Sequence, residues 1–234
     1  MRSAGAAPLL TYHDLTADVR IELSATTFGN WVDKTTSLLD SLGVEQGERV
    51  VLPVLQERPD HWVGLVWAMA AWQFGSPVAA VSRADASGLD AGVVVIGPDE
   101  VSEVGHHLTV ACSLAPFGQG FAEVPGGVSD YHDVLGEPDI GVVGPAVPDP
   151  AYTDAHRALG AREVMAVPAS AQRRLLRPHS AWQALSEGLL APLLGGGSTV
   201  LVRGGDPQRW DAVARAERAA PPHPDLSTTN QETR

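Results

Sequence analysis

The stretch from Glu48 to Ser82 constrains the fold of this chain most, because it predicts a strand, a buried helix and a second strand in succession. Residues 48–55 include a continuous apolar run, which is typical of a strand covered on both faces. Residues 62–74 are apolar nearly all round, and a helix of this kind lies inside a protein. Residues 77–82 predict a return strand, parallel to the first through a right-handed crossover.

The ends of the buried helix carry residues that suit helix ends. Pro59 favours a helix start, and Asp60 is suited to the N-cap or the first turn. Gly75 can adopt the left-handed conformation that ends a helix. We therefore expect the helix to begin at Asp60 or just after it.

The chain before this stretch predicts a terminal hairpin and an amphipathic helix. Residues 9–12 and 19–23 are short β-type runs separated by a polar turn. Hydroxyl side chains at 24–27 can cap a helix whose apolar positions, from 28 to 42, follow one stripe at helical spacing.

The rest of the chain alternates short apolar runs with helical patterns. Strands are expected at 92–97, 107–112, 140–143, 162–167 and 199–202. Helices are expected at 98–104, 131–135, 153–159, 178–194 and 206–219. This alternation predicts an α/β protein with a layered, mainly parallel sheet flanked by helices.

The predicted organisation is a single domain followed by a tail. The domain covers residues 1–219, with a division into subdomains 1–143 and 151–219 left open. Residues 220–234 are rich in proline and polar side chains, so a disordered tail is expected there.

The charge balance argues against two classes of partner. The net charge of −12 offers no basic face for nucleic acid or for an anionic membrane. The first residues lack the apolar core of a signal peptide, and the longest run free of polar side chains, 62–72, is too short to span a bilayer. A cytoplasmic location is therefore expected.

Two groups of side chains are candidates for chemistry, one as a nucleophile and one as a metal site. Cys112 is the only cysteine and ends a predicted buried strand without a flanking cation, which favours an inert core thiol over a nucleophile. His106 and His107 are adjacent on a predicted strand, so their side chains point to opposite faces. A metal site there is disfavoured, because no third ligand stands at a suitable spacing.

Three further groups have structural interpretations. Asp130, His132 and Asp133 could form an acid–base cluster, but a solvated loop is favoured. The glycines 195–197 lie between a helix and a strand, whereas phosphate cradles lie between a strand and a helix. The tryptophans at 62, 67 and 72 are spread around the helix by their spacing of five, which favours core packing.

No nucleotide-binding or hydrolase motif accompanies these groups. No Gly-x-Gly-x-x-Gly follows a predicted strand, and no Gly-x-Ser-x-Gly is present. The sequence therefore predicts no catalytic, cofactor-binding or metal-binding residue and no cofactor.

Two segments carry a family resemblance. The first runs from Thr26 through Leu39-Asp40-Ser41-Leu42-Gly43-Val44-Glu45-Gln46-Gly47-Glu48-Arg49-Val50 and continues into the 62–74 helix and the 77–82 strand. The second joins Arg162–Pro168, Leu189–Leu194 and Gly197–Val202. Together they resemble the opening part of the adenylate-forming (AMP-binding, acyl-CoA synthetase-like) superfamily over most of residues 9–202. The size and ending also resemble a group of short actinobacterial proteins related to these synthetases.

The resemblance implies an ATP loop rich in Ser, Thr and Gly and ending in Pro-Lys-Gly, between Val143 and Thr153. The segment Gly144–Pro150 stands there instead, and its three prolines lack backbone N–H donors. No lysine follows, and Asp149 would repel a phosphate. The later adenine, ribose and magnesium motifs, and the C-terminal domain with its catalytic lysine, are not found in this sequence. Lys34, the only lysine, has no matching role.

The sequence thus favours a truncated, degenerate acyl-CoA synthetase-like protein that is catalytically inactive and acts as a binding or interaction protein. Two alternatives stay open. One is an ATP-dependent carboxylate-activating enzyme, an acyl-adenylate or CoA ligase, completed by a partner chain. The other is a small-ligand binder, with an acyl or carboxylate ligand in the cleft beyond the strand ends.

A homodimer or another protein partner is expected from the apolar character of the C-terminal part. Leu189, Leu190, Leu193 and Leu194 occupy two adjoining faces of the 178–194 helix. The strand 199–202 is apolar on both sides, and an exposed apolar strand edge invites pairing with another chain. The alternative is that the final helix covers this surface.

Overall fold

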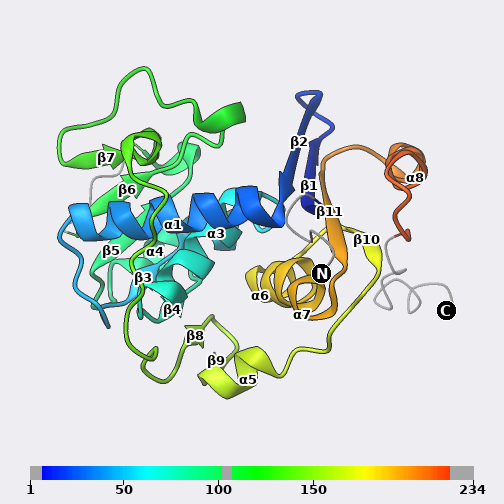
Figure 1. Ribbon diagram of the computed structural model, residues 1–234. Coiled ribbons are helices and arrows are strands. Elements are labelled where there is room, and N and C mark those ends of the chain that lie inside the picture. Colours follow the sequence, from blue (N-terminus) through cyan, green and yellow to red (C-terminus); the bar gives the residue numbers. More distant parts are fainter. Residues whose placement is uncertain (1–6, 102–106, 222–234) are drawn as a thin grey trace, which may run out of the picture.

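The computed structural model describes residues 7–101 and 107–221, which form two β-sheets with helices between and outside them (Figure 1). The larger sheet contains, in spatial order, β7 (Val128–Asp130), β6 (Thr109–Ala111), β5 (Val93–Ile96), β3 (Val50–Val51), β4 (Val78–Ala79), β8 (Tyr152–Thr153) and β9 (Ala158–Leu159). The smaller sheet contains β10 (Arg173–Leu176), β11 (Ser198–Arg203), β1 (Pro8–Asp14) and β2 (Val19–Ser24).

Neighbouring strands are parallel except in the β1–β2 and β8–β9 pairs, so the expected mainly parallel α/β architecture and the terminal hairpin are confirmed. The α-helices are α1 (Ala25–Ser41), α2 (Pro53–Glu57), α3 (Trp62–Gln73), α4 (Arg83–Ala86), α5 (Ala161–Met165), α6 (Ala181–Leu185), α7 (Ala191–Gly195) and α8 (Pro207–Ala216). Shorter helical turns are η2 (Pro98–Glu100), η3 (Pro116–Gly118) and η4 (Tyr131–Gly136), and η5 (Ser186–Leu190) is a π-helical segment.

The helices divide the apolar interior into three cores. The largest is shared: it joins one face of each sheet to α1, α3 and the α6–η5–α7 helix. Side-chain alternation along β5 separates it from the core on the outer face of the larger sheet, since Val93 and Val95 belong to the first and Val94 and Ile96 to the second. The third core lies between the smaller sheet and α8.

The buried central helix is confirmed and begins at Trp62, as the apolar run predicts, but its capping residue differs from the expectation. Leu65, Val66 and Trp67 have no exposed surface. The N-cap is His61, whose Nδ1 accepts a hydrogen bond from the Val63 N–H at 3.2 Å, so the expectation of Asp60 as the cap is wrong. An imidazole nitrogen accepts this hydrogen bond in place of the expected carboxylate.

The first central strand is shorter than the apolar run that predicts it. β3 stops at Val51, and Pro53 begins α2, because proline is pre-organised for the first helical position. Val54 and Leu55 are fully buried as part of this helix rather than of the strand. A short apolar run does not distinguish a buried strand from a buried helical turn.

The expected strand at 140–143 is wrong. Ile140 and Val143 are 79% and 76% exposed, and the segment crosses α1 and α3 as an extended strap. The Val142 N–H donates to Thr36 Oγ1 at 2.9 Å, and the Gly144 N–H donates to the carbonyl oxygen of Gln73 at 2.8 Å. The next strand of the larger sheet is instead β8, which pairs with β4.

Two further elements downstream have the opposite type to the prediction. Residues 153–159, expected as a helix, turn from β8 into β9, and residues 162–167, expected as a strand, contain α5. β10 was not predicted, because it opens with Arg173 and Arg174. Pairing with β11 decides its conformation, and the sequence pattern does not show that pairing.

The C-terminal apolar strand is covered rather than exposed. β11 lies between β10 and β1, and Val200, Leu201 and Val202 are at most 1% exposed. The final helix, α8, packs against Val200 and Val202, which is the alternative considered above. The expectation of an open apolar edge is therefore wrong for this strand.

The predicted helix over 178–194 forms as α6, η5 and α7 in direct succession. Leu189 and Leu190 are buried, whereas Leu193 and Leu194 are 40% and 44% exposed. Pro192 accounts for the π-helical segment: it has no N–H for the carbonyl four residues back, and the Ala191 N–H bonds the Ser186 carbonyl, five residues back.

The end of the described chain lies beside β10. The Ala220 N–H donates to the Arg173 carbonyl at 2.9 Å, and its own carbonyl accepts from the Leu175 N–H at 2.9 Å. The tail expected at 220–234 therefore begins with a paired residue, and its remainder, 222–234, lies outside the described residues. Each sheet takes strands from both sides of residue 150, and the division into subdomains stays a prediction.

Candidate functional site

The carboxyl edge of the larger sheet is where an α/β fold places ligands. The strands from β3 to β8 run parallel, so the segments that follow them meet at this edge. Polar side chains follow these strands, and we describe their partners strand by strand. The candidate groups are Arg58, Asp60 and His61 after β3, Ser82 after β4, Asp99 after β5, Ser113 after β6, His132 after β7, and Asp154 with Arg157 after β8.

The turn after β8 is closed around the carboxylate of Asp154. Asp154 Oδ1 accepts the His156 N–H at 2.8 Å, and Oδ2 accepts the Tyr152 hydroxyl at 3.1 Å. Arg157 Nε lies 3.5 Å from Oδ2, and the Asp154 N–H donates to the Arg157 carbonyl at 3.0 Å. The N–H groups of Asp154 and His156 and the side chain of Arg157 are thus engaged by the turn itself.

The segment 144–150 does not lie at this edge, so the position expected for an ATP loop is wrong. It precedes β8 instead of following a strand. Asp149 Oδ1 accepts the Ala161 N–H at 3.1 Å at the start of α5, and Pro145 packs against Gly75. A phosphate-binding loop at the carboxyl end of β8 would have to begin after Thr153, and the turn around Asp154 occupies that place.

The cluster expected from Asp130, His132 and Asp133 holds a loop together. The Asp130 carboxylate accepts the Phe121 N–H at 2.7 Å and the His132 N–H at 2.9 Å. The His132 ring nitrogen Nδ1 lies 2.7 Å from the Gly118 carbonyl oxygen. His132 and Asp133 are exposed, as expected, but they belong to the helical turn η4 rather than to a loop, and Asp130 ends β7.

Cys112 lies in the shared core with 1% of its surface exposed. Burial raises the pKa of its thiol far above the ordinary value, which favours the protonated form, and the expected place of Cys112 in the core is confirmed. Beside it lies a cavity of about 10 Å³, lined by Trp31, Trp62 and Tyr131. This space is sufficient for at most one water molecule.

A charged junction joins the carboxyl ends of both sheets. Arg203, at the end of β11, lies 3.4 Å from Asp14, at the end of β1. Arg58, which follows α2, pairs with Asp99 at 3.2 Å. Burial raises the pKa of the Asp60 carboxyl, and the positive charges of Arg203 and Arg58 oppose that rise.

The interior side of this junction is neutral. The His61 ring meets the Tyr12 ring edge to face, with centroids 4.6 Å apart. Burial, and then the charges of Arg58 and Arg203, lower the pKa of His61 to about 3. Burial also raises the pKa of Tyr12, with Asp14 adding to the effect. A neutral imidazole and a neutral phenol at neutral pH suit a packing role rather than proton transfer.

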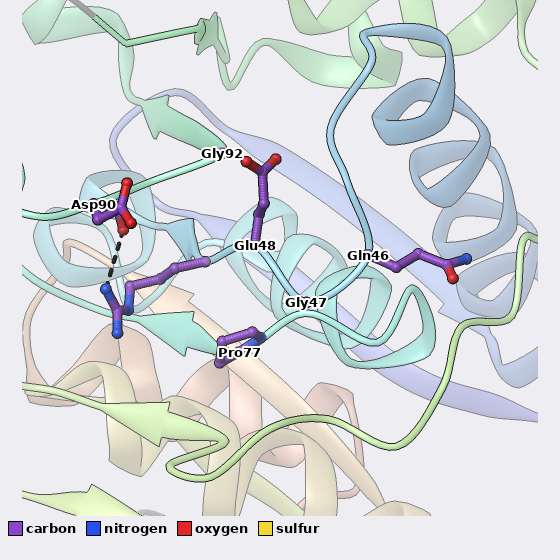
Figure 2. A pocket seen from close by; sticks show the side chains of 7 residues that line it. Gln46, Gly47, Glu48, Pro77, Asp90 and Gly92 are labelled. Carbon is purple, nitrogen blue, oxygen red and sulfur yellow. Dashed lines mark hydrogen bonds between the residues drawn. The ribbon is translucent and has the colours of Figure 1, made fainter.

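A cavity of about 430 Å³ opens at the opposite, amino edge of the larger sheet. Figure 2 shows the side chains that line it. Gly47, Pro77 and Gly92, which precede β3, β4 and β5, line it together with charged side chains. An Arg49 nitrogen donates to the Asp90 carbonyl at 3.0 Å. A Cβ at Gly92 would lie 2.7 Å from a carboxylate oxygen of Glu48, so the glycine makes room for that side chain. Sequence reasoning missed this cavity because it searched the carboxyl edge.

The remaining candidates have structural roles or lie outside the described chain. Gly196, with φ of 74°, ends α7 as part of the turn into β11, so the interpretation of 195–197 as a turn is confirmed. Lys34 Nζ donates to the carbonyl of Glu137 and holds η4 against α1. His107 is half-buried, and His106 lies outside the described residues.

Residues 7–101 and 107–221 contain neither a metal-binding cluster nor a membrane-spanning helix. No group of three or more His, Cys, Asp or Glu side chains converges there in a metal-binding arrangement. Within the same ranges, the helices fall short of the length and apolarity needed to cross a bilayer.

Comparison with solved structures defines the class of fold. The chain superposes on an acyl-CoA synthetase of Brucella canis with a TM-score of 0.71 and 15% identity, covering 94% of this chain and 45% of that one. Acetoacetyl-CoA synthetase of Streptomyces lividans (TM-score 0.67, 20% identity) and a benzoate CoA ligase of Burkholderia xenovorans LB400 (TM-score 0.64, 15% identity) are similar over 93% and 92% of this chain, and over 40% and 45% of their own. The fold is therefore that of the N-terminal part of the acyl-CoA synthetases, and the chain spans less than half of each.

Sequence comparison supplies the family. No family model matches the chain. A protein of Mycobacterium tuberculosis (strain ATCC 25618 / H37Rv) described as a TIGR03089 family protein is 31% identical over 236 residues, which cover 93% of each protein. The chain belongs to the TIGR03089 family.

Proposed function

We propose that this protein is a pseudoenzyme of the acyl-CoA synthetase fold, which acts by binding another molecule rather than by activating a carboxylate. The observation that supports this most is the closed turn after β8. A phosphate-binding loop needs free N–H donors at a strand end. Here the Asp154 carboxylate itself accepts the His156 N–H and the Tyr152 hydroxyl, as a bound anion would.

The electrostatics of the turn support the same proposal. A phosphate approaching the end of β8 would meet the negative charge of Asp154 at short range. Arg157, the one cation of the turn, is already paired with that carboxylate at 3.5 Å. Lys34 is the only lysine of the sequence, and its Nζ donates hydrogen bonds to the carbonyl oxygens of Leu135 and Glu137. Neither Arg157 nor Lys34 is therefore free to neutralise the charge of a triphosphate.

ATP with magnesium is therefore expected to leave the stability of the protein unchanged. A site with a dissociation constant of about 10 µM would stabilise the fold by roughly 2.7 kcal/mol at 1 mM nucleotide. For a domain of this size such a gain raises the melting temperature by about 5–10 °C. A thermal-shift measurement with ATP and magnesium, with magnesium alone as control, checks this. A clear rise with the nucleotide alone would instead support the carboxylate-activating enzyme, and pyrophosphate exchange would then be assayed.

The proposed binding partner is a second copy of the chain or another protein. Two side chains of the strap over α1 and α3, Ile140 and Val143, are among the most exposed large apolar groups of the described chain. Exposed apolar surface of this kind marks interfaces, and a two-fold dimer is the commonest way to cover an identical patch. The final strand, by contrast, contributes nothing to such a surface.

Light scattering behind a sizing column at micromolar concentration is expected to give a mass above that of the monomer. The double variant Ile140→Ser, Val143→Ser should shift the mass towards the monomer, because it removes the apolar side chains of the strap. Met165→Ser is the matched control, since Met165 is 58% exposed but lies on α5. A parent protein that elutes as a monomer at all concentrations would contradict self-association.

A further inference from the structure

A groove of about 540 Å³ runs along the α6–η5–α7 helix on the side that faces the loop after α5. Trp182, Ser186 and Glu187 line it from the helix, and Val167 and Pro168 line it from the loop. One side of the Trp182 ring is held by Tyr152, with ring centroids 5.0 Å apart. The volume is within the range of ligand-binding pockets, and most of the wall is apolar.

Arg174 lines this groove and differs from its neighbour on β10. Arg173 points to the other face of the sheet, where it bonds Thr11 at 2.9 Å, Ser198 at 3.1 Å and Glu217 at 2.7 Å. The guanidinium of the half-buried Arg174 has no hydrogen-bond or ion-pair partner within the part of the chain that the structure describes. A partly desolvated guanidinium beside apolar walls favours a carboxylate partner, which it can bind with two parallel hydrogen bonds.

The two acids of the groove are held by their own elements. Glu163 accepts the Gly160 N–H at 2.8 Å in the cap of α5, and Glu187 accepts from Gln183 at 3.3 Å. Within the described part of the chain neither carboxylate pairs with Arg174, so its guanidinium remains available to a carboxylate from another segment. An apolar side chain next to that carboxylate would complete the match to the apolar wall.

The chain's own C-terminal segment leaves the structure beside this arginine. Ala220 forms a parallel bridge with Arg174. The first acid beyond it is Asp225, and the apolar Leu226 follows directly. Prolines at 221, 222 and 224 favour an extended conformation that rises about 3.1 Å per residue, so five residues reach roughly 15 Å. That reach is ample for a carboxylate to meet the long side chain of Arg174.

We propose that the C-terminal segment 222–226 docks into this groove of the same molecule, with the Asp225 carboxylate paired to Arg174 and Leu226 packed on Trp182. The prolines reduce the conformational freedom that docking removes. The segment then occupies an apolar groove that another chain could otherwise enter, so it acts as an internal plug. This inference does not depend on the proposed function, because it concerns neither nucleotide binding nor the strap over α1 and α3.

Paramagnetic broadening in the full-length chain tests the docking. Ser227→Cys carries a nitroxide label, and the buried Cys112 does not react in the folded protein. The indole N–H signal of Trp182, assigned through Trp182→Phe, is expected to be lost, while the signals of Trp62 and Trp67 persist. Arg174→Gln or Asp225→Asn should restore the Trp182 signal, and Arg174→Asp combined with Asp225→Arg should remove it again.

Arg177→Gln is the matched control. Arg177 follows β10 but lies over the Trp210 ring, 3.5 Å from its centroid, so its replacement should leave the broadening unchanged. A Trp182 signal unaffected by the label would overturn the proposal. So would broadening that survives Arg174→Gln, or broadening of an isotope-labelled chain by a separate spin-labelled copy, since the latter makes a second molecule the occupant.

Discussion

Replacement of Trp67 by alanine is expected to lower the free energy of unfolding by roughly 3–5 kcal/mol. Trp67 has no exposed surface and lies in the middle of α3, inside the core that both sheets share. Its ring packs on Tyr131 with centroids 5.1 Å apart. Alanine would leave a cavity between α3 and the larger sheet, and the surrounding strands and helices are too constrained to fill it.

Urea unfolding followed by circular dichroism measures this loss. Trp182→Ala is the matched control, because Trp182 is only half-buried at the wall of a surface groove. Its loss should be clearly smaller, since part of its surface is already in water. A Trp67→Ala variant that unfolds at the same urea concentration as the parent would contradict the burial of α3.

The correctly predicted elements are mainly those whose hydrophobic pattern extends over enough residues to identify a helix or a strand. The apolar stripe of α1 and the all-apolar surface of α3 each extend over several turns, and β1 contains a run of four buried residues, 9–12. β5 is four consecutive β-branched residues, Val93 to Ile96, and is buried on both faces. In these cases local preference and tertiary burial agree, so the sequence alone identifies the element.

Most of the wrongly predicted elements lie between residues 139 and 176, where strands are short and pairing decides the structure. β8 and β9 have two residues each, which is too short for any periodic signal. The apolar run 140–143 satisfies strand propensity, yet its backbone bonds to side chains and carbonyls of α1 and α3. Tertiary contacts override local propensity in such segments.

The same error moved the candidate site. With a strand expected at 140–143, the ATP loop that the resemblance implies is expected between Val143 and Thr153. The structure places the strand at β8, so the segment that matters begins at Asp154. The sequence does contain a signal for this turn. Asp154 follows Tyr152-Thr153, and an aspartate at such a position commonly closes a turn by accepting the backbone N–H two residues later, here that of His156. The internal pairing of Asp154 was not predictable, because it depends on the β8–β9 register.

The second large effect is expected at Glu217, which caps the C-terminal end of α8. A negative charge at this end of a helix is unfavourable by itself. Three side chains from the smaller sheet offset it: Arg173 at 2.7 Å, Arg20 at 2.8 Å and the His13 ring nitrogen at 2.9 Å. The side chain of Glu217 is only 10% exposed, so these contacts fix α8 to the sheet in a largely dry setting.

Glu217→Gln is expected to lower the stability at neutral pH by about 2–3 kcal/mol, because it removes the charge that holds two arginines. Glu22→Gln is the matched control on β2. Glu22 also contacts Arg20, at 2.5 Å, but both side chains are well exposed, and such pairs contribute little. Chemical unfolding of the three proteins at one pH therefore separates the buried contact from the exposed one.

The pH dependence of this stability difference follows from the pKa of Glu217, which is lowered to about 2. The hydrogen bond from Arg20 lowers it most, those from His13 and Arg173 lower it further, and burial opposes them. A carboxyl whose pKa is lowered in the folded state contributes stability above its unfolded pKa of about 4.5 and loses it as the pH falls through the folded value. The gap between parent and Glu217→Gln should therefore be constant above about pH 5 and narrow steadily towards pH 2. Stability curves of both proteins over this range measure the gap directly, since the other carboxyls titrate alike in both. A gap that stays the same at pH 3 as at pH 7 would show that the charge of Glu217 does not hold α8 to the sheet.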